Sequence, residues 1–256
     1  MTHLPVAADA TGYTPRSDVE IRPLRSTQDF EACVELQREV WGFGQGDVVP
    51  SSLLHVVEYV GGIAAGAFGD NGELLGFVFG MSGLRDGELA HWSHMLAVRE
   101  SHRDSGLGRA LKEYQRSAMG AVGIRRIYWS FDPLMAKNAH FNINRLGASV
   151  VEYVPDMYGV TSSPLHLGLP TDRLIVAIDT SRTFRSRTPA SSDELLIEIP
   201  GDIADVTRES LALARHWRLA VRDQFQRALA SGHAVDSVRR DGGRAYYVLR
   251  TPGRMA

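Results

Sequence analysis

Apolar positions recur along this chain with two periods, and these periods predict its elements. Residues 19–25 alternate apolar and polar side chains, which is typical of a strand. Residues 28–41 repeat apolar side chains every three or four positions, which indicates an amphipathic helix. Ser51 or Ser52 is available to cap a second helix. Up to residue 179 the pattern predicts strands over 19–25, 62–69, 73–83, 90–98, 125–132, 148–154 and 173–179, and helices over 28–41, 50–60, 110–122 and 137–147.

The order of these elements, β-α-α-β-β-β-α-β-α-β-β, predicts an α/β fold. We expect a mixed, mostly antiparallel sheet flanked by helices, with one right-handed βαβ crossover. A polar segment with three arginines and one proline then indicates a linker. The predicted organisation is a flexible arm over 1–18, a main domain over 19–180, the linker over 181–193 and a β-α-β extension over 194–256.

Composition excludes several classes of function. The formal net charge of −2 over 256 residues gives no electrostatic reason to expect nucleic acid as a partner. A single cysteine, Cys33, excludes an intrachain disulfide and a zinc site built on several thiolates, and we expect no metal. The chain has neither a signal-peptide pattern nor an apolar run approaching the roughly 20 residues that span a bilayer. We therefore expect a cytoplasmic protein without a membrane partner.

The segment HRDSGLGR joins a predicted strand to a predicted helix and contains the pattern Arg103-x-x-Gly106-x-Gly108. Glycines let backbone approach a ligand closely and reach positive φ. The start of the following helix offers unpaired N–H groups and a partial positive charge, which suit a pyrophosphate. Arg103 and Arg109 add charge-assisted hydrogen bonds.

Two familiar phosphate loops do not fit these letters. A dinucleotide fingerprint requires a third glycine where this chain has Leu111, and a nucleotide-triphosphate loop requires Gly-Lys-Ser/Thr where it has Gly108-Arg109-Ala110. A glycine-rich loop alone is also compatible with a tight turn. An NAD- or ATP-using enzyme is therefore disfavoured, and tight binding of either nucleotide would revive it.

The wider segment LAVRESHRDSGLGRAL resembles the acyl-CoA loop of the GNAT acyltransferase superfamily. In that family an apolar strand ending L-x-V leads through a short turn to [QR]-x-x-G-x-[GA] at the start of a helix. The matching positions are Leu96, Val98, Arg103, Gly106 and Gly108. The predicted element order resembles the GNAT fold as well, over about residues 20 to 179. The resemblance implies that the main domain is a GNAT acyltransferase domain.

The resemblance also implies how an acyl-CoA co-substrate is bound. Backbone amides near Leu96, Ala97 and Val98 are expected to pair with the pantetheine arm at a bulge in the strand. Asn138 matches an asparagine that hydrogen-bonds the CoA arm in the family. The pyrophosphate is expected on Arg103, Asp104, Ser105, Gly106, Leu107, Gly108 and Arg109.

Acyl transfer to an amine requires a base for the amine and an acid for the departing thiolate. His94 is the predicted base because it lies two residues before Leu96 and can titrate near neutrality. His91 is the second candidate, with Ser93 orienting whichever imidazole acts, and a packing role for the histidine stays open.

The acid is less clear from the sequence. Many family members place a tyrosine four residues before the glycine that ends the short helix, but here that position, counted back from Gly147, holds Ile143. Asn142 and Tyr158 are the predicted alternatives, and protonation by water stays open. The missing tyrosine also keeps open a non-catalytic acyl-CoA-binding sensor or scaffold.

The acceptor is expected to be a small-molecule amine or an amino acid. Residues 41–52, with Asp47, and residues 157–172 are the expected walls of its pocket. Acetyl is the default donor group, since it is the most frequent in the family. A succinyl donor calls for a cation, for which the candidates are Lys137, Arg145 and Arg85. The tail covers the sheet, completes the pocket or forms a homodimer contact, and these alternatives stay open.

Overall fold

The computed structural model describes residues 19–42, 48–159, 168–184 and 194–251. The predicted arm over 1–18 lies outside these residues, as do Asp47 and most of the predicted linker. The chain divides into two compact units. The first holds the chain up to Trp129 and the short segment Asp179–Thr183, and the second holds Ser130–Ile178 and the chain from Phe184 onward.

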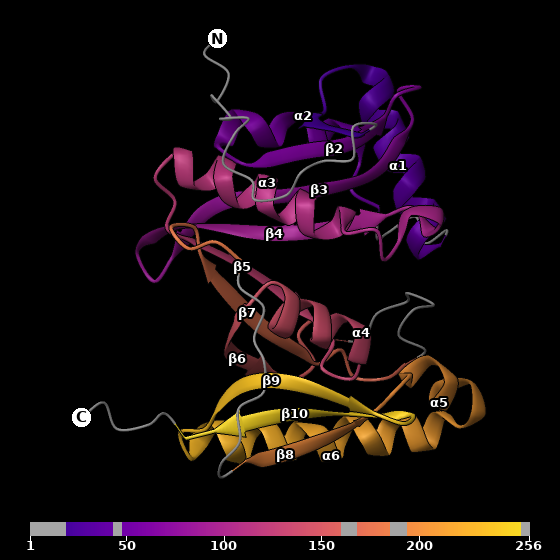
Figure 1. The fold of residues 1–256 in the computed structure, drawn as a ribbon, viewed down its shortest axis with the longest axis vertical. Helices are drawn as coiled ribbons and strands as arrows, with labels where there is room; N and C mark the ends of the chain where they lie inside the picture. The colour runs from indigo at the N-terminus through magenta and orange to yellow at the C-terminus, as the bar shows by residue number, and fades with distance from the viewer. Residues whose placement is uncertain (1–18, 43–47, 160–167, 185–193, 252–256) are drawn as a thin grey trace. The chain divides into compact units, whose positions relative to one another are not determined.

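The first unit is built on strands in the order β1-β2-β3-β4-β5 (Figure 1). Neighbours from β1 to β4 are antiparallel, whereas β5 begins parallel to β4. The strands span Val19–Pro23, Ile63–Gly69, Leu74–Arg85, Glu88–Val98 and Arg126–Phe131, of which the last runs on into the second unit. The helices are α1 (Thr27–Trp41), α2 (Ser51–Val56) with the 3-10 turn η1 (Val57–Val60), and α3 (Leu107–Ala121). The predicted mixed, mostly antiparallel α/β fold is confirmed.

The two faces of this sheet are covered by different helices. Phe77 and Phe79 of β3 join an apolar core with residues of α1 and α2, such as Leu36 and Leu54. Gly76 of β3 points the opposite way, where a Cβ would lie 3.2 Å from Leu111 of α3. Figure 1 shows α3 lying along β3 and β4. The alternation of side chains along β3 therefore separates an α1/α2 face from an α3 face.

Helix starts follow the local sequence in one case and not in another. Ser26 caps α1, accepting from the Asp29 N–H while the Asp29 carboxylate accepts from the Ser26 N–H. The prediction that Ser51 or Ser52 caps α2 is wrong, because the cap position is Pro50 and neither serine precedes the helix. Pro50 fixes its own φ near the value that helix entry needs, so the turn forms without a side-chain cap.

The second unit combines the end of the predicted main domain with the tail. It holds α4 (Ala136–Ala139), the π-helical turn η3 (His140–Arg145), and the antiparallel strands β6 (Ser149–Val154) and β7 (Arg173–Asp179). The tail adds a three-stranded antiparallel sheet in the order β8-β10-β9 and two helices. Their bounds are β8 Leu195–Pro200, α5 Ile203–Glu209, α6 Leu211–Ala230, β9 Ala234–Asp241 and β10 Arg244–Arg250.

The tail differs from the predicted β-α-β pattern in two places. Ser210 has φ −158°, so it ends α5 and caps α6 with its hydroxyl, and the predicted long helix is divided. The strand β9 is additional. A register shift at Asp236, opposite Val248 and Leu249, changes the face to which the following residues point, so Val235, Ser237 and Val238 are all buried and the period of two is lost in its sequence.

Residues 130–178 and the tail share one core. The Asn144 side-chain amide donates to the Val238 carbonyl at 3.0 Å and accepts from the Val238 N–H at 2.8 Å. The Tyr247 hydroxyl donates to the Pro133 carbonyl at 2.8 Å. Phe225 of α6 stacks on Tyr153 of β6, with ring centroids 5.4 Å apart. The tail is therefore packed into the second unit. No helix in the described part of the chain is long and apolar enough to cross a membrane.

Candidate active site

The strand β4 carries a bulge at His94. Its partner strand β3 pairs Phe79 with Met95 and the next residue, Gly80, with Ser93, so His94 has no opposite residue. A Cβ at position 80 would lie 2.3 Å from His91 Nε2, so the sequence needs glycine opposite the bulge. The bulge re-aims the side chains on either side of it.

Beyond this bulge, no described residue of the first unit pairs with one edge of β4. The parallel pairing of β4 with β5 consists of His91 with Ile127 and Trp92 with Tyr128. From Leu96 to Val98, β4 is paired on its other edge by β3. The unpaired edge therefore presents backbone N–H and C=O groups to a ligand with amide groups of its own.

The glycine loop leaves the end of β4 and turns sharply before α3. A 3-10 turn over Glu100–His102 is followed by Asp104 with φ 59° and Gly106 with φ 89°. Ser105 Oγ donates to the His102 carbonyl at 2.6 Å, which stabilises the turn. Gly106 occupies the N-cap position of α3 in the left-handed region, where glycine is favoured.

The N-terminus of α3 is arranged to attract an anion. Its cap, Gly106, has no side chain to accept from the first N–H groups, and no acidic residue lies in the first turn. Leu107 is buried and anchors the helix, whereas Gly108 and Arg109 are partly exposed. Arg103 is exposed, and its Nε donates to the Val98 carbonyl at 3.4 Å. These groups form a positively polarised rim around the helix start.

His94 lies on the α1/α2 face at the bulge. Its ring packs edge-on against Phe79, with centroids 6.0 Å apart and an interplanar angle of 79°. The residue keeps an exposed edge, yet the surrounding protein removes enough water to lower the pKa of its imidazole below the ordinary value. A neutral imidazole with an open edge is able to accept a proton at neutral pH.

His91, the second candidate for the base, is enclosed on the α3 face. Its Nδ1 lies 3.0 Å from Ser82 Oγ and its Nε2 lies 3.0 Å from Gln115 Nε2. Burial, with a smaller effect from the charge of Lys112, lowers the pKa of His91 to about 3. Both ring nitrogens are occupied within the protein, so we assign His91 a packing role.

No protein-family model matches the sequence, and no curated protein matches it. A GNAT-family protein from Desulfovibrio desulfuricans superposes with a TM-score of 0.52 at 18% identity, covering 63% of this chain and 99% of that one. The yncA protein of Salmonella typhimurium, solved with its cofactor acetyl-CoA, gives a TM-score of 0.50 at 18% identity over 69% of this chain and 99% of that one. NAA60 of Arabidopsis thaliana, solved with a bisubstrate analogue, gives 0.50 at 19% identity over 63% and 97%.

The chain has the GNAT fold. In the first unit, the GNAT-fold strand β4 brings together the bulge at His94, the segment Leu96–Val98 and the glycine loop that leads into α3. These are the predicted site residues that the structure places on one continuous strand-loop-helix segment.

The remaining predicted site residues belong to the second unit. Asn138 is exposed on α4. Asn142 is buried within η3, where its backbone carbonyl accepts from the Ala148 N–H at 3.0 Å. Tyr158 is 48% exposed, and its hydroxyl lies 3.4 Å from Ser130 Oγ. Ile143, at the position of the expected tyrosine, is fully buried.

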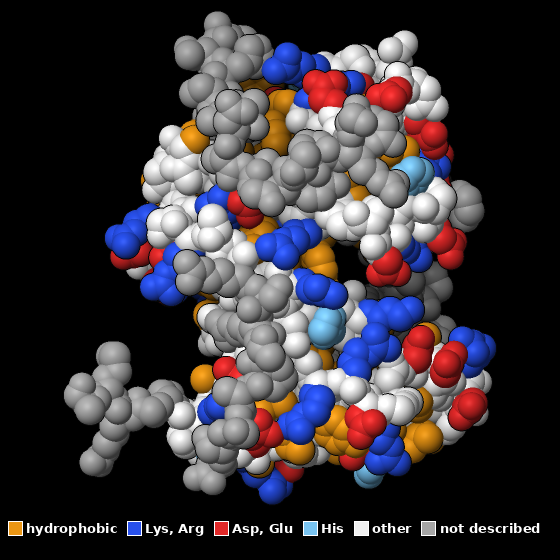
Figure 2. Space-filling model, viewed as in Figure 1, with side chains coloured by type: hydrophobic (Ala, Val, Ile, Leu, Met, Phe, Trp, Pro, Cys, Tyr) orange, Lys and Arg blue, Asp and Glu red, His pale blue; other side chains and the backbone are white. Residues whose placement is uncertain are grey.

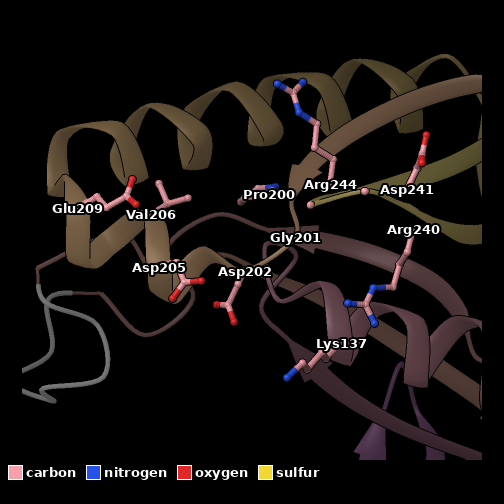
Figure 3. Close-up of a pocket in the computed structure, with 12 residues that line it drawn as sticks. Lys137, Pro200, Gly201, Asp202, Asp205, Val206, Glu209, Arg240, Asp241 and Arg244 are labelled. Atoms are coloured by element: carbon pink, nitrogen blue, oxygen red, sulfur yellow. The ribbon is translucent and has the colours of Figure 1, made fainter.

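The second unit also contains an open pocket of about 620 Å³. Figure 3 shows Lys137 and Arg240 on one wall, facing Asp202 and Asp205 on the other. Figure 2 shows acidic and basic side chains beside one another on the visible face of this unit. Because the walls carry both charges and are open to solvent, the pocket does not select a ligand class by charge.

Sequence reasoning missed Lys112. It lies on the buried face of α3, 3% exposed, and its Nζ donates to Ser93 Oγ at 2.6 Å. The same Nζ lies 4.0 Å from the centroid of the Trp129 ring. The sequence carries no signal for it, because a lysine within an amphipathic helix is ordinarily part of the solvated face.

Proposed function

We propose that the protein is an acyl-CoA-dependent N-acyltransferase that moves an acetyl group from CoA to the amine of a small molecule or an amino acid. The observation that carries this proposal is that the anion-attracting start of α3 and the His94 bulge lie at the two ends of one unpaired β4 edge. The GNAT fold supports the same reaction class.

The loop supplies the binding site for the co-substrate. The N–H groups at the start of α3, with Arg103 and Arg109 beside them, hold the pyrophosphate, and Asp104, Ser105 and Leu107 shape the turn that presents them. The unpaired edge over Leu96–Val98 hydrogen-bonds the amides of the pantetheine arm in the manner of an added strand.

His94 then acts as the base. It accepts a proton from the acceptor amine, whose nitrogen attacks the thioester carbonyl. The new C–N bond forms as the C–S bond breaks, and the sulfur takes up a proton. The amine attacks the thioester directly, so no covalent enzyme intermediate is required. His94 therefore needs no serine or cysteine nucleophile beside it.

The first test is thermal stability against CoA, acetyl-CoA, succinyl-CoA, NAD and ATP. We expect the CoA species alone to raise the melting temperature, because ligand binding to the native state stabilises it by mass action. An increase with NAD or ATP and none with CoA would contradict the proposal. The better of the two esters decides between acetyl and succinyl.

The second test is turnover. CoA thiol release from the preferred ester is measured with a panel of amines and amino acids, against the same mixtures without an amine. An amine-dependent rate supports the acyltransferase. Binding of acyl-CoA with no release above hydrolysis would instead indicate a sensor or scaffold.

A further inference from the structure

Lys112 is a buried amine without an anionic partner among the described residues. It forms no ion pair with a described carboxylate, and its hydrogen bond to Ser93 Oγ and its contact with the Trp129 ring are neutral. A lysine ammonium has three donors, and burying it costs several kcal/mol unless it is compensated. A buried amine without a counter-charge suggests that it takes part in the reaction.

Its place on the sheet indicates that task. Pairing between β4 and β5 ends at Trp92 and Tyr128, and the next residues are Ser93 and Trp129. These are the two residues that contact Lys112 Nζ. Lys112 therefore lies where the two strands stop pairing, at the end of the unpaired β4 edge on which we have proposed that the pantetheine arm binds.

The lysine also lies on the same side as the glycine loop. Lys112 is four residues beyond Gly108, one helical turn along α3 from the proposed phosphate site. His94 lies on the opposite face of β4, against Phe79. The bulge thus separates a base on the α1/α2 face from an amine on the α3 face.

We propose that Lys112, acting through the Ser93 hydroxyl, returns a proton to the CoA sulfur as the thioester bond breaks. This inference rests on the proposed acyltransferase function. It supplies the acid that is missing at Ile143, and it gives Ser93 a role on the side of the leaving group.

The proton transfers balance. The C–S bonding electrons remain on sulfur, which takes the proton of the Ser93 hydroxyl. Ser93 Oγ receives a proton from the Lys112 ammonium, with which it is already hydrogen-bonded at 2.6 Å. The acceptor amine gives its proton to His94. Exchange with solvent then discharges His94 and recharges Lys112.

The electrostatics of the site agree with an acid that works near neutrality. Burial lowers the pKa of Lys112 to about 7, below the value of about 8.5 for an ordinary thiol. An acid is most effective when its pKa lies near the working pH.

Other titratable neighbours do not take over the proton. His91, which faces Lys112 from β4, has a pKa of about 3 and stays neutral. Glu113 and Arg116 of α3 form an ion pair with each other, and β5 contributes the Trp129 ring, which does not titrate. His94 is on the far face of the strand.

The first test measures the pKa of the thiol of bound CoA by following the absorbance of its thiolate as the pH is changed. The ammonium is expected to lower this pKa by roughly one unit or more, with the two titrations coupled. Lys112→Met should restore the ordinary value, while Lys112→Arg should retain the decrease. The protein's own thiol does not interfere, because burial raises the pKa of Cys33 to about 12.

The second test is the pH profile of kcat. In the wild type the rate should fall as the pH rises through about 7, because neutral Lys112 cannot donate. Lys112→Met and Lys112→Arg should both lower kcat by about 100-fold and lose this alkaline limb, since arginine keeps the charge but does not release its proton. Ser93→Ala should behave in the same way, and Ser93→Thr should recover the rate.

Gln115→Met is the matched control. It removes another buried polar group from the same face of α3, but Gln115 contacts His91, where the strands are still paired. Its stability should fall while its kcat and pH profile stay unchanged.

The outcomes separate the two proposals. Failure of the wild type to bind CoA or to release thiol would overturn the proposed function. Normal wild-type turnover with an unchanged thiol pKa and alkaline limb in the Lys112 variants would overturn only the role of Lys112. Loss of that limb in Tyr158→Phe, with its retention in the Lys112 variants, would assign the acid to Tyr158.

Discussion

Arg218 of α6 and Asp132, which follows β5, form a two-pronged ion pair in the second unit, with Nη1 to Oδ1 at 2.5 Å and Nη2 to Oδ2 at 2.6 Å. Arg218 is 4% exposed, so it depends on this carboxylate. A second arginine of the same helix, Arg222, pairs with the buried Asp172 through Nε and Nη2. Arg218 and Arg222 are therefore both paired within the protein.

Asp132→Ala should lower the free energy of unfolding by about 3 kcal/mol or more, because it leaves the buried Arg218 guanidinium unpaired. The measurement is urea unfolding followed by circular dichroism. Asp205→Ala is the control, since its pair with Arg208 has side chains 61% and 75% exposed, and its loss should stay within about 1 kcal/mol. Equal losses in the two variants would contradict the importance of burial here.

Gly106→Ala should weaken CoA binding by about tenfold or more. The alanine is strained at φ 89°, by about 1 kcal/mol, and its methyl group stands beside the N–H groups that we propose hold the pyrophosphate. Gly123→Ala is a matched control, because Gly123 has φ 82° and open space at the other end of α3. Both variants should lose similar stability in urea, and calorimetry should detect weaker CoA binding in the Gly106 variant alone.

His94→Ala should lower kcat by about 100-fold or more with little change in acyl-CoA affinity. The lowered pKa of His94 keeps the imidazole neutral at pH 7, so the acidic limb of the wild-type rate should lie at that lowered value. The variant should lack this acidic limb. His216→Ala, on the exposed surface of α6, is the control, and an unchanged rate in the His94 variant would assign the base to an ordered water.

Asp29 should make stability depend on pH in the acid range. Burial alone would raise the pKa of this carboxyl, but Arg22 and the N–H groups of Arg25 and Ser26 outweigh it and hold the pKa at about 2. The folded pKa lies below the unfolded one, so the stabilisation is complete above the ordinary value of 3.8 and is lost as the pH falls toward about 2.

Asp29→Asn tests this dependence by difference. At neutral pH the variant should be less stable by about 1 kcal/mol, since the capping box is weakened. The difference between the free energies of unfolding of wild type and variant, measured in urea, should disappear as the pH falls through this range. A difference that stays constant would show that the carboxylate charge does not contribute.

Much of the fold could be predicted because its signals are local. The spacing of apolar residues marks α1, the alternation marks β3 and β4, and the letters around Gly106 mark the loop. The strand β9 was not predicted, because a register shift at Asp236 leaves Val235, Ser237 and Val238 all buried and destroys the alternation. The predicted domain boundaries rest on the polar linker and stay a prediction, since a linker does not reveal which residues pack beyond it.

The candidate site could be predicted only in part for a similar reason. His94 and the glycine loop follow one another along the chain, so their neighbourhood is visible in the sequence. Lys112 contacts Ser93, nineteen residues away, and Trp129, on a different strand. In a sequence the lysine looks like part of a solvated helix face, and only the packing of α3 on β4 shows that it is buried.

The Asn144 side-chain amide forms the two hydrogen bonds with the Val238 C=O and N–H that the backbone of a neighbouring strand would otherwise form. Part of the β9 backbone is therefore paired by a side chain from outside the tail. A protein shortened to end before Leu195 would lose that strand, the arginines of α6 that pair with Asp132 and Asp172, and the Phe225 ring that stacks on Tyr153. Trimming the tail yields a fragment with an open core and two carboxylates that have lost their arginine partners. The protein therefore has to be made and assayed with its tail.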